Sequence, residues 1–308
     1  QTCALPIFLS MICWGLSFVW SKVVFKYYDP ISTITLRLVI SSVILFAVLF
    51  LFYRKEIVPL GKDLKMFVLL SFFEPFLYFI GESFGLQKVD ATITSVIIST
   101  IPVFTAIVGF YFLKEKLTLI NFIGIFVSCS GVVTMMLNKE MKFNAPLDGI
   151  LLIFLAVFAS INYGVVMKKI SVKYHPIYII AVQNLIGIIW FLPLFLIFGY
   201  QKFIQVTPNF ELLASLICLS IFASSLAFIL YTYVVRALGI AKANVYTNFI
   251  PIFTAIGAFF ILDEGLTMMK VLGIIITISG VYLSQRTVKR RKLNKGIAEN
   301  EYTSPNIG

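Results

Sequence analysis

A succession of apolar runs, each about as long as a membrane is thick, constrains this chain more than any other feature. A helix needs about 20 apolar residues to cross a hydrocarbon core of roughly 30 Å. Hydrophobic residues make up 60% of the chain and charged residues only 13%, which is more apolar surface than a soluble domain can bury. The sequence therefore predicts an all-α membrane protein with ten transmembrane helices. The predicted helices are 5–25, 31–52, 66–86, 92–113, 117–137, 149–167, 177–198, 212–235, 241–262 and 267–284.

The distribution of Lys and Arg predicts which way the helices face, because positively charged loops stay in the cytoplasm. With the N-terminus inside, the inner loops and tail hold 17 Lys and Arg, and the outer loops hold 7. We therefore expect both termini to be cytoplasmic. The net charge of +11 is then explained by Lys and Arg beside the ends of transmembrane helices. No nucleic-acid partner is therefore expected. The basic tail 288–308 is expected to anchor the topology or to touch anionic lipid.

The sequence repeats itself at an offset of 149 residues. Pro102 falls on Pro251 and Glu115 on Glu264 without a gap, and 15 of the 31 positions from 102 to 132 are identical. Composition alone explains shared apolar residues, but not Pro and Glu at one offset. Each half, 1–142 and 143–287, has five predicted helices, and this odd number turns the second half upside down. Inverted repeats are typical of transporters that work by alternating access.

Two blocks in the repeat resemble the twin EamA-like domains of the drug/metabolite transporter superfamily. Each block is followed by a Gly-rich helix, and the resemblance covers nearly the whole chain. The blocks are 101–104 through 113–117 and 250–253 through 262–266, and the helices are 122–132 and 272–281. The resemblance implies ten helices, a bacterial inner-membrane location, and export or facilitated passage of amino acids or other small metabolites. The shared motifs are largely architectural, so they do not specify a substrate.

The two prolines of the repeat are predicted to lie in mid-helix. There each one removes a hydrogen bond, so Pro102 frees the carbonyl of Ile98 and Pro251 frees that of Thr247. Such carbonyls persist in a membrane only if protein, water or substrate satisfies them. Two interpretations stay open, a flexible point that lines the pathway and gates it, and a static kink.

The other positions that the two halves share have structural interpretations. Glu115 and Glu264 fall just past predicted helix ends, and we expect them to be structural rather than substrate ligands. Small residues recur on one face of the Gly-rich helices, where helices in lipid approach closely. These residues, predicted to serve packing, are Gly124, Ser128, Gly131, Gly273, Thr277 and Gly280.

Three ionisable residues fall inside predicted helices. An ionised side chain near the bilayer centre costs roughly 2.5 to 3.5 kcal/mol, so it usually faces a cavity and has a partner. At about 1.5 Å per residue, Arg37 and Glu82 lie roughly 9 and 6 Å below the outer surface, where they could form an ion pair. Glu74 lies near the midplane, with Tyr78 and Glu82 following it on one helical stripe. Glu74 is predicted to contact a substrate ammonium or carry a proton; a structural hydrogen bond and a lipid-facing position are the alternatives.

Polar residues in both halves predict a central cavity. Asn244 and Asn248 map at the 149-residue offset onto Ser95 and Ser99, so matching stripes could face one space. Any single member could instead form an interhelical hydrogen bond. Other residues that could complete the site are Trp14, Ser17, Ser21, Asn162, Tyr163, Gln183, Asn184 and Tyr231.

No enzyme signature is apparent. The single histidine, His175, precedes a proline in a turn, and the four cysteines have no metal-ligand spacing, so neither a metal nor a cofactor is expected.

We expect a secondary transporter or facilitator that moves an amino-acid-like metabolite by alternating access, with export favoured through the resemblance. A proton-coupled drug or cation exporter is the alternative within the class. A membrane-embedded enzyme or a non-transporting sensor is the alternative from another class. One sequence does not predict the oligomeric state.

Overall fold

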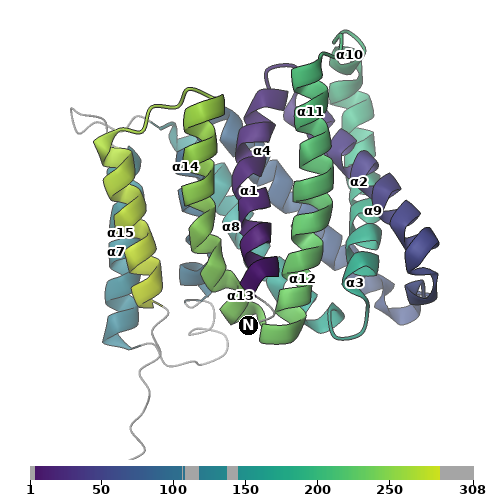
Figure 1. The fold of residues 1–308 in the computed structure, drawn as a ribbon, viewed down its shortest axis with the longest axis horizontal. Coiled ribbons are helices and arrows are strands. Elements are labelled where there is room, and N and C mark those ends of the chain that lie inside the picture. Colours follow the sequence, from purple (N-terminus) through teal and green to yellow (C-terminus); the bar gives the residue numbers. More distant parts are fainter. Residues whose placement is uncertain (1–3, 106, 108–117, 137–144, 285–308) are drawn as a thin grey trace, which may run out of the picture.

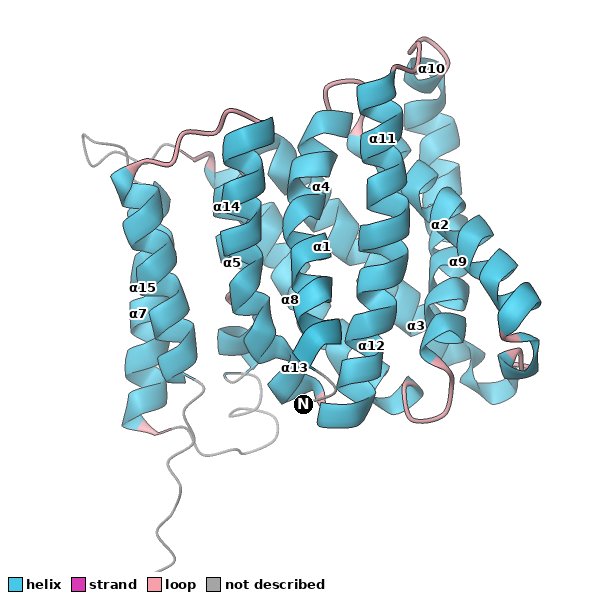
Figure 2. Ribbon diagram, in the orientation of Figure 1, coloured by secondary structure: helices cyan, strands magenta, loops and turns pink. Residues whose placement is uncertain are grey.

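The computed structural model describes residues 4–105, 107, 118–136 and 145–284, and these residues form helices and turns without a strand (Figures 1 and 2). The fold class is therefore all-α, as predicted. The helices are α1 (Ala4–Val24), α2 (Pro30–Phe52), α3 (Leu64–Ser71), α4 (Tyr78–Lys88), α5 (Ala91–Ile98), α7 (Leu119–Met136), α8 (Leu147–Ile170), α9 (Pro176–Leu194), α10 (Tyr200–Phe203), α11 (Phe210–Cys218), α12 (Ala227–Leu238), α13 (Ile240–Val245), α14 (Ile250–Ile261) and α15 (Met268–Ser284). Short segments between them are η1 (Arg54–Glu56), η2 (Gly61–Asp63), η3 (Phe72–Leu77), η4 (Phe195–Gly199), η5 (Leu219–Leu226) and η6 (Tyr246–Phe249).

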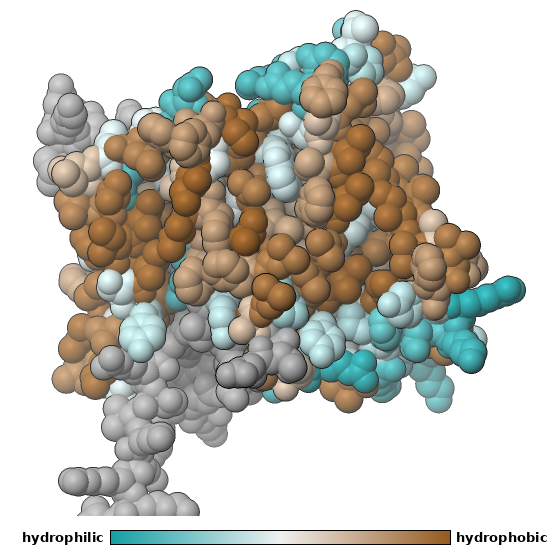
Figure 3. All heavy atoms as spheres, in the orientation of Figure 1, coloured by the Kyte–Doolittle hydropathy of each residue, from teal (hydrophilic) through white to brown (hydrophobic). Residues whose placement is uncertain are grey.

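Six helical stretches of the described chain are long and apolar enough to cross a membrane. They are Ala4–Val24, Pro30–Phe52, Gly61–Lys88, Leu147–Ile170, Pro176–Phe203 and Phe210–Leu238. Four shorter apolar helices are Ala91–Thr105, Leu119–Met135, Tyr246–Ile261 and Met268–Ser284. On the face in Figure 3, hydrophobic side chains cover the middle and hydrophilic ones gather at the two ends. This distribution is that of a multi-pass membrane protein.

Local sequence explains where several helices begin. Asp29 caps α2, since its carboxylate Oδ1 accepts a hydrogen bond from the Ser32 N–H at 3.0 Å and Pro30 supplies the first helical residue. Asn209 caps α11 in the same way through the N–H of Leu212, at 2.9 Å. A side-chain oxygen at this position satisfies a backbone N–H that has no partner within the helix. Polar turns between apolar runs therefore determine the ends of these spans.

The helices α7 and α15 pack together along one side of the bundle (Figure 1). A Cβ atom added at Gly280 would lie 2.2 Å from the backbone nitrogen of Ser128, and one at Gly124 would lie 2.2 Å from that of Ser284. Only glycine permits this backbone approach, because any side chain would overlap the neighbouring helix. The prediction that these small residues serve packing is confirmed.

The predicted helix 66–86 is not continuous. It is divided into α3, the π-helical segment η3 and α4, and Glu74 has extended backbone angles, with φ −144° and ψ 117°. Pro75 explains the break, because a proline ring disfavours helical angles in the residue before it. The expectation that Glu74, Tyr78 and Glu82 share one regular stripe was therefore wrong in its geometry.

The two prolines of the repeat are not in mid-helix either. Pro251 occupies the first turn of α14, which follows α13 and the 3-10 turn η6. Pro102 likewise follows a turn at 99–100 that separates α5 from the helical residues 101–105. A proline costs little at a helix start, where the missing N–H would have no partner within the helix. The predicted mid-helix kinks are thus breaks between successive helical segments.

Candidate functional site

A cavity lies among helices of both halves, at the centre of the bundle. It encloses about 630 Å³ of empty space, including the part that is open to solvent. Its walls come from α1, α2, η3, α4, α5 and α8, and from the α12–α14 region. The lining residues are Trp14, Ser17, Phe18, Arg37, Glu74, Tyr78, Phe79, Glu82, Ile98, Ile101, Ser160, Tyr163, Phe228, Tyr231, Asn244, Thr247 and Ile250.

All three predicted intramembrane charges line this cavity. Arg37 is 2% exposed, and Glu74 and Glu82 are each 3% exposed. Glu74 lies at the break in the helix, where its backbone is not helical, and Glu82 lies on the regular helix α4. The cavity therefore gathers one guanidinium and two carboxyl groups at positions that are shielded from bulk water.

A buried polar network holds Arg37. Its Nε donates to the Ser224 hydroxyl at 2.8 Å, and its Cζ lies 4.3 Å from the ring centroid of Phe79. One turn further along α2, the Ser41 hydroxyl donates to the Ser224 carbonyl at 3.4 Å and accepts from the Asn184 amide at 2.8 Å. The same Asn184 amide donates to the Ser224 carbonyl at 3.2 Å. The network joins α2, α9 and η5 and fixes the guanidinium at the cavity wall.

The predicted ion pair between Arg37 and Glu82 does not form. No salt bridge within 4.0 Å links Arg37 to Glu82 or Glu74, three residues that the structure describes. Instead, the guanidinium donates a hydrogen bond to Ser224 and lies over the ring of Phe79. As a result, Glu74 Oε1 and Glu82 Oε2 are buried without a hydrogen-bond partner. A buried oxygen without a partner is costly, so each of these atoms calls for a proton or a donor from a ligand.

Aromatic side chains form another part of the cavity wall. The ring centroid of Trp14 lies 5.0 Å from those of both Phe228 and Tyr231. The Tyr231 hydroxyl donates to Asn244 Oδ1 at 2.6 Å, and the Tyr163 hydroxyl donates to an amide oxygen on α9 at 3.3 Å. These bonds orient the rings, whose faces attract cations. The cavity thus combines acidic and aromatic groups, a chemistry suited to an amphipathic ligand with an ammonium group.

Lining residues recur at the offset of the sequence repeat. Five pairs are separated by 149 positions, so both members of each pair contribute to the same cavity. The pairs are Trp14 with Tyr163, Phe79 with Phe228, Glu82 with Tyr231, Ile98 with Thr247, and Ile101 with Ile250. Arg37 and Glu74 break this correspondence, since their counterparts Ile186 and Ala223 do not line the cavity, and the counterpart of Glu82 is the uncharged Tyr231. Every charge in the lining therefore comes from the first half of the chain.

Seven of the thirteen predicted site and gating residues line the cavity, and the other six do not. The seven are Trp14, Arg37, Glu74, Tyr78, Glu82, Tyr231 and Asn244. The Ser95 and Ser99 hydroxyls donate to carbonyls of the preceding helical turn, at 2.7 Å each. The amide of the half-buried Asn162 donates to the Phe158 carbonyl at 2.9 Å. Asn248 is buried with Oδ1 unpartnered, and Pro102 and Pro251 are buried at helix starts. The expectation that both matching stripes face one space was therefore wrong for Ser95, Ser99 and Asn248.

Sequence reasoning missed the partner of Arg37 and several walls of the cavity. Ser224 gives no local signal, because it is one of several serines in an apolar run. Pro75 did carry a signal, since a proline directly after Glu74 predicts a break in the helix at that point. Missed lining residues are Phe18, Phe79, Ile101, Ser160, Phe228 and Ile250, whereas the sequence indicates Ile98 and Thr247 through carbonyls that could line the pathway. Within the described ranges, no group of three or more His, Cys, Asp or Glu is arranged to hold a metal ion.

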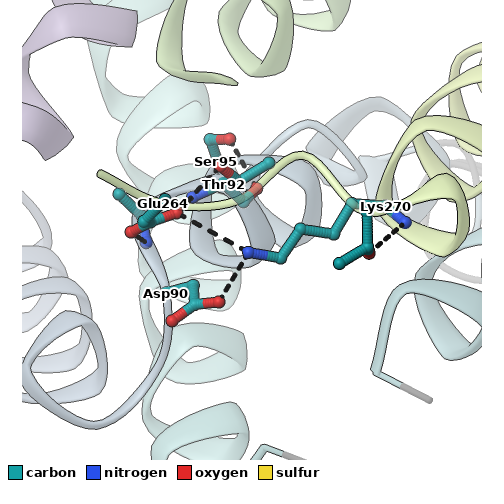
Figure 4. Close-up of polar contacts among 7 residues, drawn as sticks. Asp90, Thr92, Ser95, Glu264 and Lys270 are labelled. Carbon is teal, nitrogen blue, oxygen red and sulfur yellow. Dashed lines mark hydrogen bonds and ion pairs between the residues drawn. The ribbon is translucent and has the colours of Figure 1, made fainter. Parts of the chain in front are cut away.

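Glu264 has the structural role that was predicted for it. It accepts hydrogen bonds from the backbone N–H groups of Ala91 and Thr92, at the start of α5 (Figure 4). Lys270 lies beside it and donates to Asp90 at 2.8 Å. This cluster joins the two halves of the chain at one end of the bundle. Its counterpart in the repeat, Glu115, lies outside the described residues.

Comparison with known proteins identifies the family. The EamA-like transporter family matches residues 1–137 and 147–285, which together make up most of the chain. The chain belongs to the EamA-like transporter family. Among EamA-like relatives, an uncharacterized transporter of Archaeoglobus fulgidus is 29% identical over 279 residues, covering 90% of this chain and 94% of its own. The uncharacterized transporter YoaV of Bacillus subtilis is 25% identical over 285 residues, covering 92% and 96%.

A solved crystal structure shares the EamA-like fold. It superimposes with a TM-score of 0.68 at 13% sequence identity, and the match covers 92% of this chain and 98% of the other. The family and its relatives indicate a membrane transporter rather than an enzyme.

Proposed function

We propose that this EamA-like protein is a secondary transporter or facilitator that binds its substrate in the central cavity and works by alternating access. The observation that carries this proposal is the cavity itself, because both halves line it and two buried carboxyl groups in it have unpartnered oxygens. A substrate site near the midplane, between two related halves, is the arrangement that alternating access requires.

The proposed architecture is ten membrane crossings in two inverted five-helix repeats, 1–142 and 143–287. Six long apolar spans and four shorter apolar helices support this number. The five pairs of lining residues at the 149-residue offset support a shared cavity between the repeats. The proposed location is a bacterial inner membrane with both termini cytoplasmic, as the Lys and Arg distribution predicts.

The proposed substrate is a small amphipathic metabolite of the amino-acid type, moved in the direction of export. Its ammonium group would take the unpartnered oxygen of Glu74, and its apolar part would lie against Trp14 and Tyr231. Arg37 uses its Nε for Ser224, and no described acceptor bonds its two terminal nitrogens. Those nitrogens supply donors for a substrate carboxylate, since guanidinium groups bind carboxylates with good geometry.

The experiment is substrate flux in proteoliposomes with a panel of amino acids and related amines. We expect flux of at least one amino-acid-like compound in the wild type and its loss in Glu74→Gln. The matched control is Glu56→Gln, because Glu56 is an exposed carboxylate in η1, outside the cavity. Unchanged flux in Glu74→Gln would refute the proposed role of Glu74 in substrate binding. The absence of flux for the whole panel would refute the proposed substrate class.

A proton-coupled exporter of organic cations is the second candidate. The observation that favours it is the excess of two carboxyl groups over one guanidinium in the cavity lining. A carboxyl group that binds a proton and a cation in alternation couples their movements in opposite directions. Flux by this mechanism would depend steeply on pH and drive proton movement, whereas facilitated passage of a zwitterion would not. Measuring internal pH during flux separates the two.

A further inference from the structure

The helix α5 is capped by a residue from the other half of the chain. Ala91 N donates to Glu264 Oε1 at 2.8 Å, while Thr92 N and Thr92 Oγ1 donate to Glu264 Oε2 at 3.3 and 3.0 Å (Figure 4). The first N–H groups of a helix have no partner within the helix, so they need acceptors from elsewhere. Glu264 supplies these acceptors from the connection between α14 and α15.

The same helix has a cap residue of its own, which is not used. Asp90 has the extended backbone of a cap, with φ −57° and ψ 148°, and its carbonyl accepts the first helical hydrogen bond, from Thr94 N, at 2.9 Å. Aspartate is among the best residues at this position, because its carboxylate reaches the N–H of the second or third helical residue. Here it makes no such bond, and Asp90 Oδ2 accepts from Lys270 Nζ at 2.8 Å instead.

Lys270 lies within reach of both carboxylates. Its Nζ is 4.0 Å from Glu264 Oε2, and the Lys270 and Glu264 side chains are each only 12% exposed. Glu264 belongs to the connection from α14 to α15, and Lys270 lies in the first turn of α15. In this connection Asp263 has a positive φ of 54°, and the Glu264 N–H donates to the Ala258 carbonyl near the end of α14 at 3.1 Å. A movement of this connection together with the start of α15 therefore carries Glu264 and Lys270 together.

The cluster lies on a helix that also lines the cavity. Ile98 is six residues beyond Thr92 on α5, a distance of about 9 Å along the helix axis. The contacts of Glu264 and Lys270 thus tie the second half to the first near this end of the cavity. The charge distribution predicts that this end faces the outside.

We propose that this end of the cavity opens by an exchange of the cap on α5, a step that rests on the transporter function proposed above. In the closed state described here, Glu264 caps α5 and Lys270 holds Asp90. When the α14–α15 connection and the first turn of α15 withdraw, Lys270 pairs with Glu264, and the Asp90 carboxylate accepts from the N–H of Thr92 or Ile93. The helix keeps an acceptor in both states, so opening does not expose an uncapped terminus. Asp90 and Glu264 are positioning residues, since neither lines the cavity.

The exchange is specific to this end of the molecule. The residue 149 positions after Asp90 is Gly239, which precedes α13 and has no side chain to act as an alternative cap. The two ends of the transporter therefore differ in how they open.

The test measures access to the cavity without any substrate, so its result does not depend on knowing the substrate. The reporter is Ser17→Cys, which lines the cavity, in a protein whose native cysteines are replaced. A membrane-impermeant maleimide is added from the side of Glu264, and the labelling rate is compared among variants that elute as one monodisperse species. The replaced residues are Cys3, Cys13, Cys129 and Cys218.

Cap exchange predicts opposite effects of the two carboxylates. Glu264→Ala removes the cap of the closed state and raises the labelling rate by about five-fold. Asp90→Ala removes the cap of the open state and also the closed-state pair with Lys270, and it lowers the rate because this partly exposed pair contributes less than a helix cap. Asp90→Asn restores the rate, because asparagine caps a helix without a charge. An increase in both alanine variants would identify a plain ionic lock and overturn the exchange. No change in either variant would identify a static contact and overturn it too.

If labelling follows these expectations while no compound shows flux, the cap exchange stands and the proposed substrate class fails. If flux is present but labelling does not separate the two alanine variants, the transporter function stands and the cap exchange fails. The two proposals are therefore tested independently.

Discussion

Arg37 shows how one side chain determines the chemistry of the cavity. Its guanidinium is engaged by Ser224 and by the Phe79 ring, so it leaves the carboxyl groups of Glu74 and Glu82 without an ion pair. A direct ion pair would have satisfied one of these carboxyl groups internally. The position of Arg37 therefore keeps acidic groups in the cavity available to a ligand or a proton.

Ser224→Ala tests the support of Arg37. The substitution removes the described acceptor of Arg37 Nε, and leaving a buried charged donor unsatisfied costs about 1–2 kcal/mol. We expect the free energy of unfolding, measured by detergent titration in mixed micelles, to fall by this amount. Ser130→Ala is the control, because Ser130 is exposed and bonds only a carbonyl of its own helix. Equal effects of the two substitutions would contradict the role of Ser224.

At the scale of the elements, helix breaks place the functional groups. Pro75 interrupts the span Gly61–Lys88 next to Glu74, and η6 separates α13 from α14 beside Asn244 and Thr247. A break lets a span change direction inside the bundle, and irregular backbone at this depth is tolerated where it lines a cavity. Two breaks therefore border the cavity, with Glu74 on one of them and Thr247 on the other.

The contact between α7 and α15 gives a prediction at this scale. Gly280→Ala forces the two helices apart, since the new methyl group would lie 2.2 Å from Ser128 N, and overpacking of this kind costs about 1–3 kcal/mol. The free energy of unfolding in mixed micelles measures this loss. Gly265→Ala serves as the matched control, because no atom lies within 4 Å of its added Cβ. A Gly280→Ala protein as stable as the control would show that the helices tolerate separation.

The whole molecule combines a repeated scaffold with an unrepeated set of charges. Five pairs of lining residues keep the 149-residue offset, while Arg37 and Glu74 have the apolar counterparts Ile186 and Ala223. Related halves provide two similar walls, and the charges of the first half make the two walls chemically different. Under the proposed function, we expect a substrate with one charged end and one apolar end to bind in one orientation.

The orientation in the membrane is tested on the whole chain. With 17 Lys and Arg predicted inside against 7 outside, both termini are expected in the cytoplasm. A fluorescent protein fused after residue 308 should fold and fluoresce, and alkaline phosphatase fused there should be inactive. The control fusion is placed in the 199–209 connection, where the predicted outer location reverses both readouts. Active phosphatase at the C-terminus would contradict the orientation.

The sequence by itself predicted that this is a membrane protein, that its fold class is all-α and that its sequence contains an internal repeat. These properties depend on composition and on local spacing, and a run of about 20 apolar residues is the length that a helix needs to cross a membrane. Sequence reasoning also selected Glu74, Glu82 and Arg37, because a charge inside a membrane requires a special environment. Pro75 marks the break at Glu74 in the sequence too, because a proline disfavours helical angles in the residue before it.

Only the tertiary structure decided which polar residues meet. Ser95 and Ser99 look equivalent to Asn244 and Asn248 in the sequence, yet their short hydroxyls bond carbonyls of their own helix, while the Asn244 amide reaches Tyr231. The partner of Arg37 was likewise undecided, because Ser224 lies 187 residues away in the chain. Helix periodicity is a local property, but the face that a helix turns to the cavity depends on how all its neighbours pack.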